Sequence, residues 1–123
     1  MSIRVLIVDD AAVMRKMIRD IFASDEFEIV GEAADGVEAV AKFNELKPDL
    51  VTMDIVMPQM SGIDATKQVL ATRPDAVVII CSALGQESLV MEAIEAGASD
   101  FIVKPFKAED VLSVVRKVMG TQA

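Results

Sequence analysis

Acidic, basic and hydroxyl side chains follow four apolar runs of this sequence, and a site for chemistry could be built from these residue types. Asp9 and Asp10 follow one run, and Asp54, Ser82 and Lys104 each follow another. Asp54 is the most informative, because a carboxylate next to an apolar run is costly to bury unless it is paired or binds a metal. The chain has no His, Tyr or Trp, so any chemistry must rest on Asp, Glu, Lys, Ser or Thr.

The chemistry that these residues favour is phosphoryl transfer. Clustered carboxylates raise one another's pKa, and Mg²⁺ relieves their repulsion because it is satisfied by a few carboxylates plus water. Lys104 could supply a second positive charge and Ser82 a hydroxyl donor to a phosphate oxygen. Such a set suits a reaction in which catalysis is mainly positioning and charge neutralisation. Asp54 is the best acceptor, since carboxylates can form aspartyl-phosphates.

Regularly spaced elements must position these residues. Five apolar runs rich in β-branched residues predict strands over residues 3–8, 28–32, 50–53, 77–81 and 101–103. Between them, apolar residues recur at helical spacing. The first two helices are expected to bury Met14, Met17, Ile18 and Ile21, and then Val37, Val40, Phe43 and Leu46.

Strands that are apolar throughout are typical of parallel sheets covered by helices on both faces. Alternating strands and helices predict an α/β fold with an open, doubly wound sheet. The carboxyl ends of such strands meet at one edge of the sheet, so the side chains named above should converge there.

Composition limits the classes of function. The chain has 123 residues, which indicates a single domain over residues 1–123. A formal charge of −8 argues against binding to nucleic acid or anionic membrane. No apolar run approaches the roughly 18 to 20 residues needed to span a bilayer, and no signal-peptide pattern is present, so we expect a cytoplasmic protein. Cys81 is expected to pack in the core.

Four separated motifs carry a family resemblance: LIVDD, MDIVMPQMSG, SA and KPF, each at a predicted strand end. With them, residues 3–119 resemble the receiver domain of two-component response regulators. The resemblance implies a flavodoxin-like (βα)5 fold with strand order 2-1-3-4-5. It also implies that a histidine kinase phosphorylates Asp54, and that the chain is not an enzyme beyond catalysing its own phosphorylation and dephosphorylation.

The same resemblance implies roles for the other residues. Asp10 and Asp54 would bind Mg²⁺ directly, Asp9 through water, and the backbone carbonyl of Val56 would complete the metal site. Ser82 and Lys104 would contact the phosphoryl group. The Lys104–Pro105 peptide bond is expected to be cis.

Longer segments, such as TMDIVMPQMSGIDA and AGASDFIVKPF, are similar to the single-domain chemotaxis regulators of non-enteric bacteria. This narrower resemblance implies a flagellar motor switch protein as the target of a monomeric regulator. Apolar Val56 and Leu84 occupy positions where polar residues can orient a hydrolytic water in some relatives. We therefore expect slow self-dephosphorylation and an auxiliary phosphatase.

An output face and a switch follow from the same resemblance. Ser82 and Phe101 would form the switch, with the ring moving inward as the hydroxyl moves toward the phosphate. Phe101 lacks the hydroxyl that Tyr supplies in many relatives. Met91 and Val114, with Leu112, fall off the expected buried stripes and could join Phe101 in a partner-binding face.

Three other readings remain open. A receiver could serve a phosphorelay outside chemotaxis. An Mg²⁺-dependent phosphohydrolase with an Asp nucleophile would need a second acid near Asp54, where this chain has Val56. A flavin-binding protein would need a phosphate loop rich in hydroxyls and glycines after the first strand, where this chain has DDAAVMR.

Overall fold

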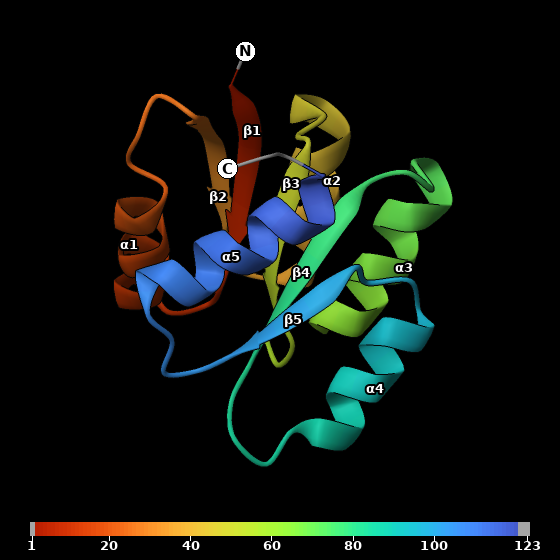
Figure 1. Ribbon diagram of the computed structural model, residues 1–123. Coiled ribbons are helices and arrows are strands. Elements are labelled where there is room, and N and C mark those ends of the chain that lie inside the picture. Colours follow the sequence, from red (N-terminus) through yellow and green to blue (C-terminus); the bar gives the residue numbers. More distant parts are fainter. Residues whose placement is uncertain (1, 121–123) are drawn as a thin grey trace.

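The computed structural model describes residues 2–120 and places five parallel strands between two layers of helices (Figure 1). The strands are β1 (Ile3–Val8), β2 (Phe27–Ala33), β3 (Leu50–Asp54), β4 (Val77–Ser82) and β5 (Asp100–Val103). The helices are α1 (Ala12–Ile21), α2 (Gly36–Leu46), α3 (Gly62–Thr72), α4 (Glu87–Glu95) and α5 (Ala108–Met119). The strand order is β2-β1-β3-β4-β5, which confirms the predicted fold.

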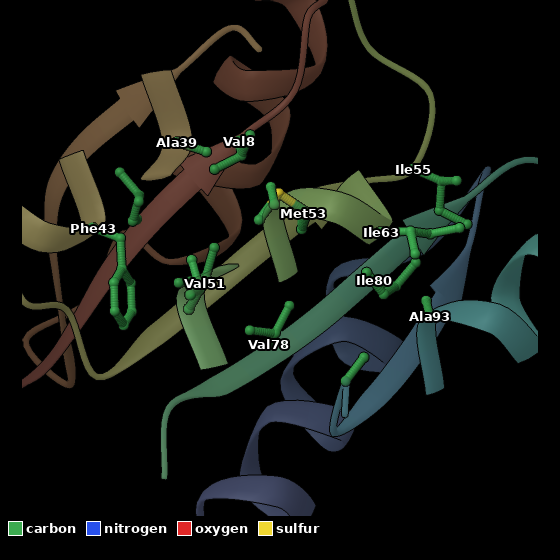
Figure 2. Close-up of a cluster of buried hydrophobic side chains, with 14 of the residues drawn as sticks. Val8, Ala39, Phe43, Val51, Met53, Ile55, Ile63, Val78, Ile80 and Ala93 are labelled. Atoms are coloured by element: carbon green, nitrogen blue, oxygen red, sulfur yellow. The ribbon is translucent and has the colours of Figure 1, made fainter. Parts of the chain in front are cut away.

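The sheet separates two apolar cores, because side chains alternate between its faces. Along β1, Val5 and Ile7 belong to the core that includes buried residues of α1 and α5, whereas Leu6 and Val8 belong to the core that includes buried residues of α2, α3 and α4. Figure 2 shows part of the second core, where Phe43 of α2 lies near Val51 of the sheet. Burial on both faces explains why the strands read as continuous apolar runs.

The helices lie between the strands, as the sequence predicted, but two side chains that were expected to be buried do not point inward. Met17 and Val37 were expected in the core and are exposed, Val37 by 53%. In α1, Ile18 takes the buried position and Met17 lies one residue, about 100°, away from it. In α2, each three-residue step falls about 60° short of a full turn, so Val37 lies off the face that buries Phe43.

Local signals fix the helix ends near the sheet edge. The Ser61 Oγ accepts a hydrogen bond from the Asp64 N–H at 3.1 Å and caps α3. Gly97 follows α4 with φ of +113°, a left-handed conformation that favours glycine at a helix end. Within residues 2–120, none of the helices is both long enough and apolar enough to cross a membrane.

Candidate functional site

Asp9 and Asp54 leave two neighbouring strands at the same level. Val8 of β1 pairs with Met53 of β3, and the residues that follow them, Asp9 and Asp54, are both acids. Oxygen atoms of Asp9, Asp10 and Asp54 lie within 4.8 Å of one another. Asp9 is 1% exposed and Asp54 8%, whereas Asp10 is open to solvent. The sequence predicted that this strand ends at residue 53, but β3 includes Asp54, and the residue is largely buried.

Lys104 brings a positive charge from β5 to this cluster. Its Nζ lies 3.0 Å from Asp9 Oδ2 and 3.4 Å from Asp54 Oδ1. Its backbone N–H donates to the Ser82 carbonyl at 2.7 Å, which ties the ends of β4 and β5 together. The bond from Lys104 to Pro105 is cis, as expected.

Backbone N–H groups hold the two buried acids in fixed orientations. Asp9 Oδ1 accepts from the Ala11 N–H at 2.9 Å, and Asp54 Oδ1 accepts from the Ile55 N–H at 2.9 Å. Among residues 2–120, Asp54 Oδ2 accepts no hydrogen bond. One oxygen of Asp54 is therefore anchored, and the other is free to accept a group.

The environment shifts two pKa values. Burial, and then the negative charge of Asp9, raise the pKa of Asp54 to about 6, although Lys104 opposes the shift. Burial works to lower the pKa of Lys104, but the hydrogen bond to Asp9 and the charge of Asp54 outweigh it and raise the pKa. Lys104 therefore keeps its proton at neutral pH, and the site favours a further positive charge beside Asp54.

The donor set fits Mg²⁺. Three carboxylates face one ammonium, and carboxylate oxygens are hard ligands suited to this ion. Asp10 is exposed, which leaves room for water on the metal, as Mg²⁺ requires. Asp9, Asp10 and Asp54 form a group that could hold the ion.

A small apolar cavity lies beside the site, between α4 and β5. Its volume is about 220 Å³, and Ser82 and Phe101 both line it, together with Val90, Met91 and Val103. Ser82 is buried at the end of β4, and Phe101 is partly exposed on β5. The two residues predicted to form a switch therefore border a common space.

The remaining predicted residues are distributed unevenly. Val56 lies in the loop after β3 with its side chain 57% exposed, Leu84 is exposed after β4, and Met91 is exposed on α4. Val114 and Leu112, which were expected to face outward, are only partly exposed, because both pack against the core under α5. Figure 1 shows α5 lying across one face of the sheet, and Val111 and Val115 are the buried residues of this helix.

Two other features delimit the site. A hollow of about 310 Å³ between the loop after β3, α3 and α4 borders Val56 but contains none of the three acids. Cys81 is buried, as expected, and burial raises the pKa of its thiol to about 12, so the thiolate does not form at neutral pH.

Sequence reasoning missed two residues that shape the site. Gly62 begins α3 so close to β3 that a Cβ there would overlap the Asp54 carbonyl oxygen. Arg15 of α1 donates from Nη1 to the Asp9 carbonyl at 2.7 Å. Neither contact has a local signal, since each depends on the packing of a helix against a strand end. The Gly62 N–H also donates to the Ile55 carbonyl at 2.7 Å.

Comparison with known proteins gives consistent matches over the whole fold. The model of the response regulator receiver domain matches residues 5–116. The chemotaxis protein CheY of Thermotoga maritima is 57% identical over 96% of this chain and 98% of that protein. CheY of Bacillus subtilis is 55% identical over 98% of this chain and all of that protein. CheY in a crystal structure of a CheX–CheY–BeF3–Mg²⁺ complex from Borrelia burgdorferi superimposes with a TM-score of 0.90 at 43% identity, over 95% of this chain and 89% of that chain.

Proposed function

Because this chain belongs to the response regulator receiver family, we propose that it accepts a phosphoryl group on Asp54 from a histidine kinase and signals to a target in chemotaxis. It is a CheY-like signalling protein rather than a classical enzyme. The observation that carries the proposal is the position of Asp54, whose carboxylate lies among two further acids and Lys104 and keeps Oδ2 free of hydrogen bonds within residues 2–120. We take residues 1–123 as one receiver domain.

In the proposed reaction, Asp54 Oδ2 forms a bond to the phosphorus of a phosphohistidine. The P–N bond breaks, and its electron pair leaves with the imidazole. Lys104 Nζ neutralises charge on a phosphoryl oxygen, and Ser82 supplies a hydroxyl to another. The Ile55 N–H keeps Asp54 Oδ1 in place during the transfer.

Asp10 and Asp54 would hold Mg²⁺ directly, Asp9 would act through water, and the Val56 carbonyl would complete the site. When bound, the ion supplies positive charge to the phosphoryl oxygens as they gain charge. The acids fit this role because their buried charges are only partly balanced by Lys104.

The switch would use the cavity between Ser82 and Phe101. Movement of the Ser82 hydroxyl toward the phosphate would vacate space on the cavity wall, and the Phe101 ring could then move inward. A volume of about 220 Å³ is sufficient for much of an aromatic side chain. Phe101 has no phenolic hydroxyl, so solvent contacts of that group cannot hold the ring outward.

The output face would comprise Met91 of α4 with Phe101 and Val103 of β5. All three are exposed and line the same cavity, so inward movement of the ring would change the shape of this face. We propose a flagellar motor switch protein as the target. Val114, which was also predicted for this face, is less accessible because it packs partly against the core.

An auxiliary phosphatase would end the signal. Val56 and Leu84 are exposed at the edge of the site but offer no polar atom to orient water. The similar structure from Borrelia burgdorferi holds a complex with a second protein, CheX, which supports the proposal that a partner protein acts on this domain. We propose that the isolated protein loses its phosphoryl group slowly.

Binding to the motor switch protein tests the chemotaxis role. The chain is mixed with a motor switch protein in Mg²⁺, with and without acetyl phosphate, and the dissociation constant is measured. Tighter binding with acetyl phosphate supports the proposal. Phosphorylation without a change in binding would indicate a receiver that serves another pathway. Continuous hydrolysis of p-nitrophenyl phosphate would instead favour a phosphohydrolase.

A further inference from the structure

We propose that Arg15 is a positioning residue for the metal site, which it serves by fixing the peptide that joins Asp9 to Asp10. This inference rests on the proposed Mg²⁺-dependent function. Arg15 lies in α1, outside the group of acids, and nothing in its side chain would touch the metal or the phosphoryl group. Its effect would pass through the backbone between two of the acids.

The contact that carries the inference is one hydrogen bond. Arg15 Nη1 donates to the Asp9 carbonyl oxygen at 2.7 Å. That oxygen belongs to the peptide unit between Asp9 and Asp10, and a peptide unit is planar. A hydrogen bond to this oxygen therefore fixes the orientation of the peptide plane, which contains the Cα atoms of both Asp9 and Asp10. Arg15 thus constrains the orientation of Asp10 relative to Asp9.

The preceding peptide is fixed by a different contact. The Asp9 N–H donates to the Ala33 carbonyl at 3.0 Å, which extends the pairing of β1 with β2. Both carboxylate oxygens of Asp9 are also engaged, by the Ala11 N–H and by Lys104. Among residues 2–120, Arg15 is the side chain that bonds to the Asp9 carbonyl.

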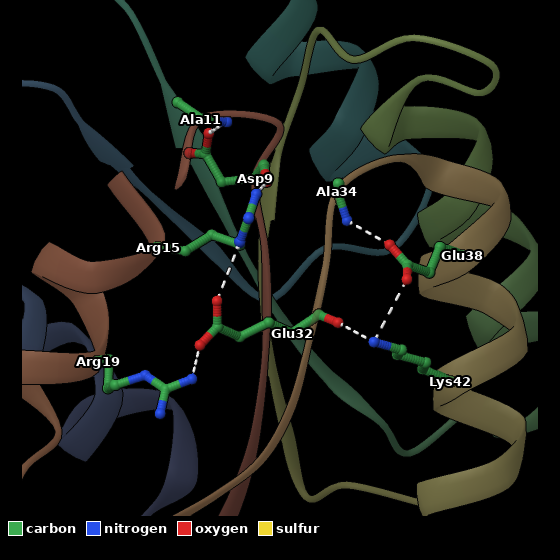
Figure 3. Close-up of polar contacts among 8 residues, drawn as sticks. All are labelled: Asp9, Ala11, Arg15, Arg19, Glu32, Ala34, Glu38 and Lys42. Carbon is green, nitrogen blue, oxygen red and sulfur yellow. Dashed lines mark hydrogen bonds and ion pairs between the residues drawn. The ribbon is translucent and has the colours of Figure 1, made fainter. Parts of the chain in front are cut away.

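Arg15 is itself held at a second point. Its Nε lies 3.0 Å from Glu32 Oε1 on β2, and both side chains are largely shielded from solvent. The other carboxylate oxygen of Glu32, Oε2, pairs with Arg19 (Figure 3). The backbone carbonyl of Glu32 accepts a hydrogen bond from Lys42 Nζ of α2. Glu32 is therefore anchored from both sides, and it orients the guanidinium that reaches Asp9.

The geometry requires a guanidinium rather than a positive charge alone. Arg15 uses two different nitrogens for two acceptors that lie on different strands. The rigid fork of a guanidinium can serve both acceptors at once, whereas a Lys ammonium at the end of a flexible stem cannot hold the same geometry. Replacement of Arg15 by Lys keeps the charge and loses the positioning.

Arg19 offers a matched control. It also pairs with Glu32, from the same helix one turn further along, but it does not contact Asp9. Arg19→Lys therefore perturbs the same ion-pair cluster and leaves the Asp9–Asp10 peptide untouched. A role confined to stability or charge would make the Arg15 and Arg19 variants behave alike.

Calorimetric titration with Mg²⁺ tests the inference, with urea unfolding of each variant as a second readout. We expect Arg15→Lys to weaken Mg²⁺ binding about tenfold, as is typical when a group that orients a metal ligand is lost. Arg19→Lys should change the affinity less than about twofold, within the range expected for a residue remote from the ligands. Arg15→Met should match Arg15→Lys in Mg²⁺ affinity, because the fork rather than the charge is required.

The outcomes separate this inference from the proposed function. Equal Mg²⁺ affinity of the wild type and Arg15→Lys would overturn the inference while leaving the function intact. An equal loss in the two Lys variants would also overturn it. Failure of the wild-type protein to bind Mg²⁺ would overturn the proposed function, and the inference with it. If Arg15→Met does not fold, Arg15→Lys, which keeps the stem and the charge, decides the question.

Discussion

Lys104 Nζ lies 3.0 Å from Asp9 Oδ2, although the two residues are 95 positions apart in the chain. Asp9 is almost completely buried, and Lys104 is 21% exposed, so the ammonium partly neutralises a charge that water cannot reach. The same Nζ is within 3.4 Å of Asp54. Lys104 therefore stabilises the metal-free site and already lies beside the carboxylate that we propose as the phosphoryl acceptor.

Lys104→Met should destabilise the metal-free protein. Removing one partner leaves a buried carboxylate unpaired, which costs about 3 kcal/mol. Mg²⁺ should recover part of this loss, because an ion that binds only the folded state stabilises it. Urea unfolding in EDTA and in Mg²⁺ measures both effects.

Lys117→Met is the matched control for that substitution. Lys117 pairs with Asp100 at 3.3 Å but is well exposed, so its loss should cost less than about 0.5 kcal/mol. Equal stabilities of the two variants in EDTA would contradict the role assigned to Lys104.

Asp54→Asn should stabilise the metal-free protein at neutral pH. The pKa of Asp54 is raised from 3.8 to about 6 on folding, so the folded state binds this proton more tightly than the unfolded state. Stability is therefore lost as the pH rises from about 4 to 6, when Asp54 ionises. We expect Asp54→Asn to be more stable by about 1–2 kcal/mol at pH 7, after allowance for screening by water. Unfolding is measured in EDTA at pH 4 and pH 7, and the difference in unfolding free energy between Asp54→Asn and the wild type should be smaller at pH 4. A difference of the same size at both pH values would be inconsistent with the raised pKa.

Gly62→Ala should disturb the end of β3. The added methyl would overlap the backbone at Asp54, and this contact cannot be relieved by rotating a side chain. We expect a loss of about 2–3 kcal/mol in unfolding free energy and weaker Mg²⁺ binding. Gly31→Ala is the comparison, since its methyl would meet only the tips of the Leu46 and Leu6 side chains. The account requires Gly62→Ala to have the larger effect on both measurements.

Val56→Asn should shorten the lifetime of the phosphoryl group. An amide at this exposed position could orient a water molecule that the valine cannot hold. We expect the phosphoryl group to be lost roughly three- to tenfold faster. This acceleration is well below the factor of about 10² to 10⁴ that a positioned general base contributes to a reaction rate. The decay of phosphorylated protein is followed after removal of acetyl phosphate. Val37→Asn serves as the control, since Val37 is equally exposed on α2 but does not border the site. If both variants decay at the wild-type rate, Val56 does not limit dephosphorylation.

Much of the fold could be predicted, because local signals repeat along the chain. Burial on both faces makes each strand a continuous apolar run, and the polar residue after each run marks its carboxyl end. Parallel strands bring these ends together, so the sequence alone places Asp9, Asp54 and Lys104 at one edge of the sheet. The structure confirms this grouping.

The errors arose where packing between elements decides the outcome. Met17 and Val37 have the residue type of a core position, but their positions around the helix axes place them off the faces that pack against the sheet, and both are exposed. Val114 is partly buried because α5 packs a wider face against the core than one stripe. Arg15 and Gly62 shape the site through contacts between a helix and a strand end, and no spacing in the sequence specifies such contacts.

The intact mass of the protein after incubation with acetyl phosphate tests the central claim, that Asp54 accepts a phosphoryl group in an Mg²⁺-dependent reaction. The account predicts one added phosphoryl group in Mg²⁺ and none in EDTA. Asp54→Asn should remain unmodified, whereas Asp75→Asn, at an exposed turn away from the site, should be modified like the wild type. Unchanged modification of Asp54→Asn, or no modification of the wild type in Mg²⁺, would contradict the account.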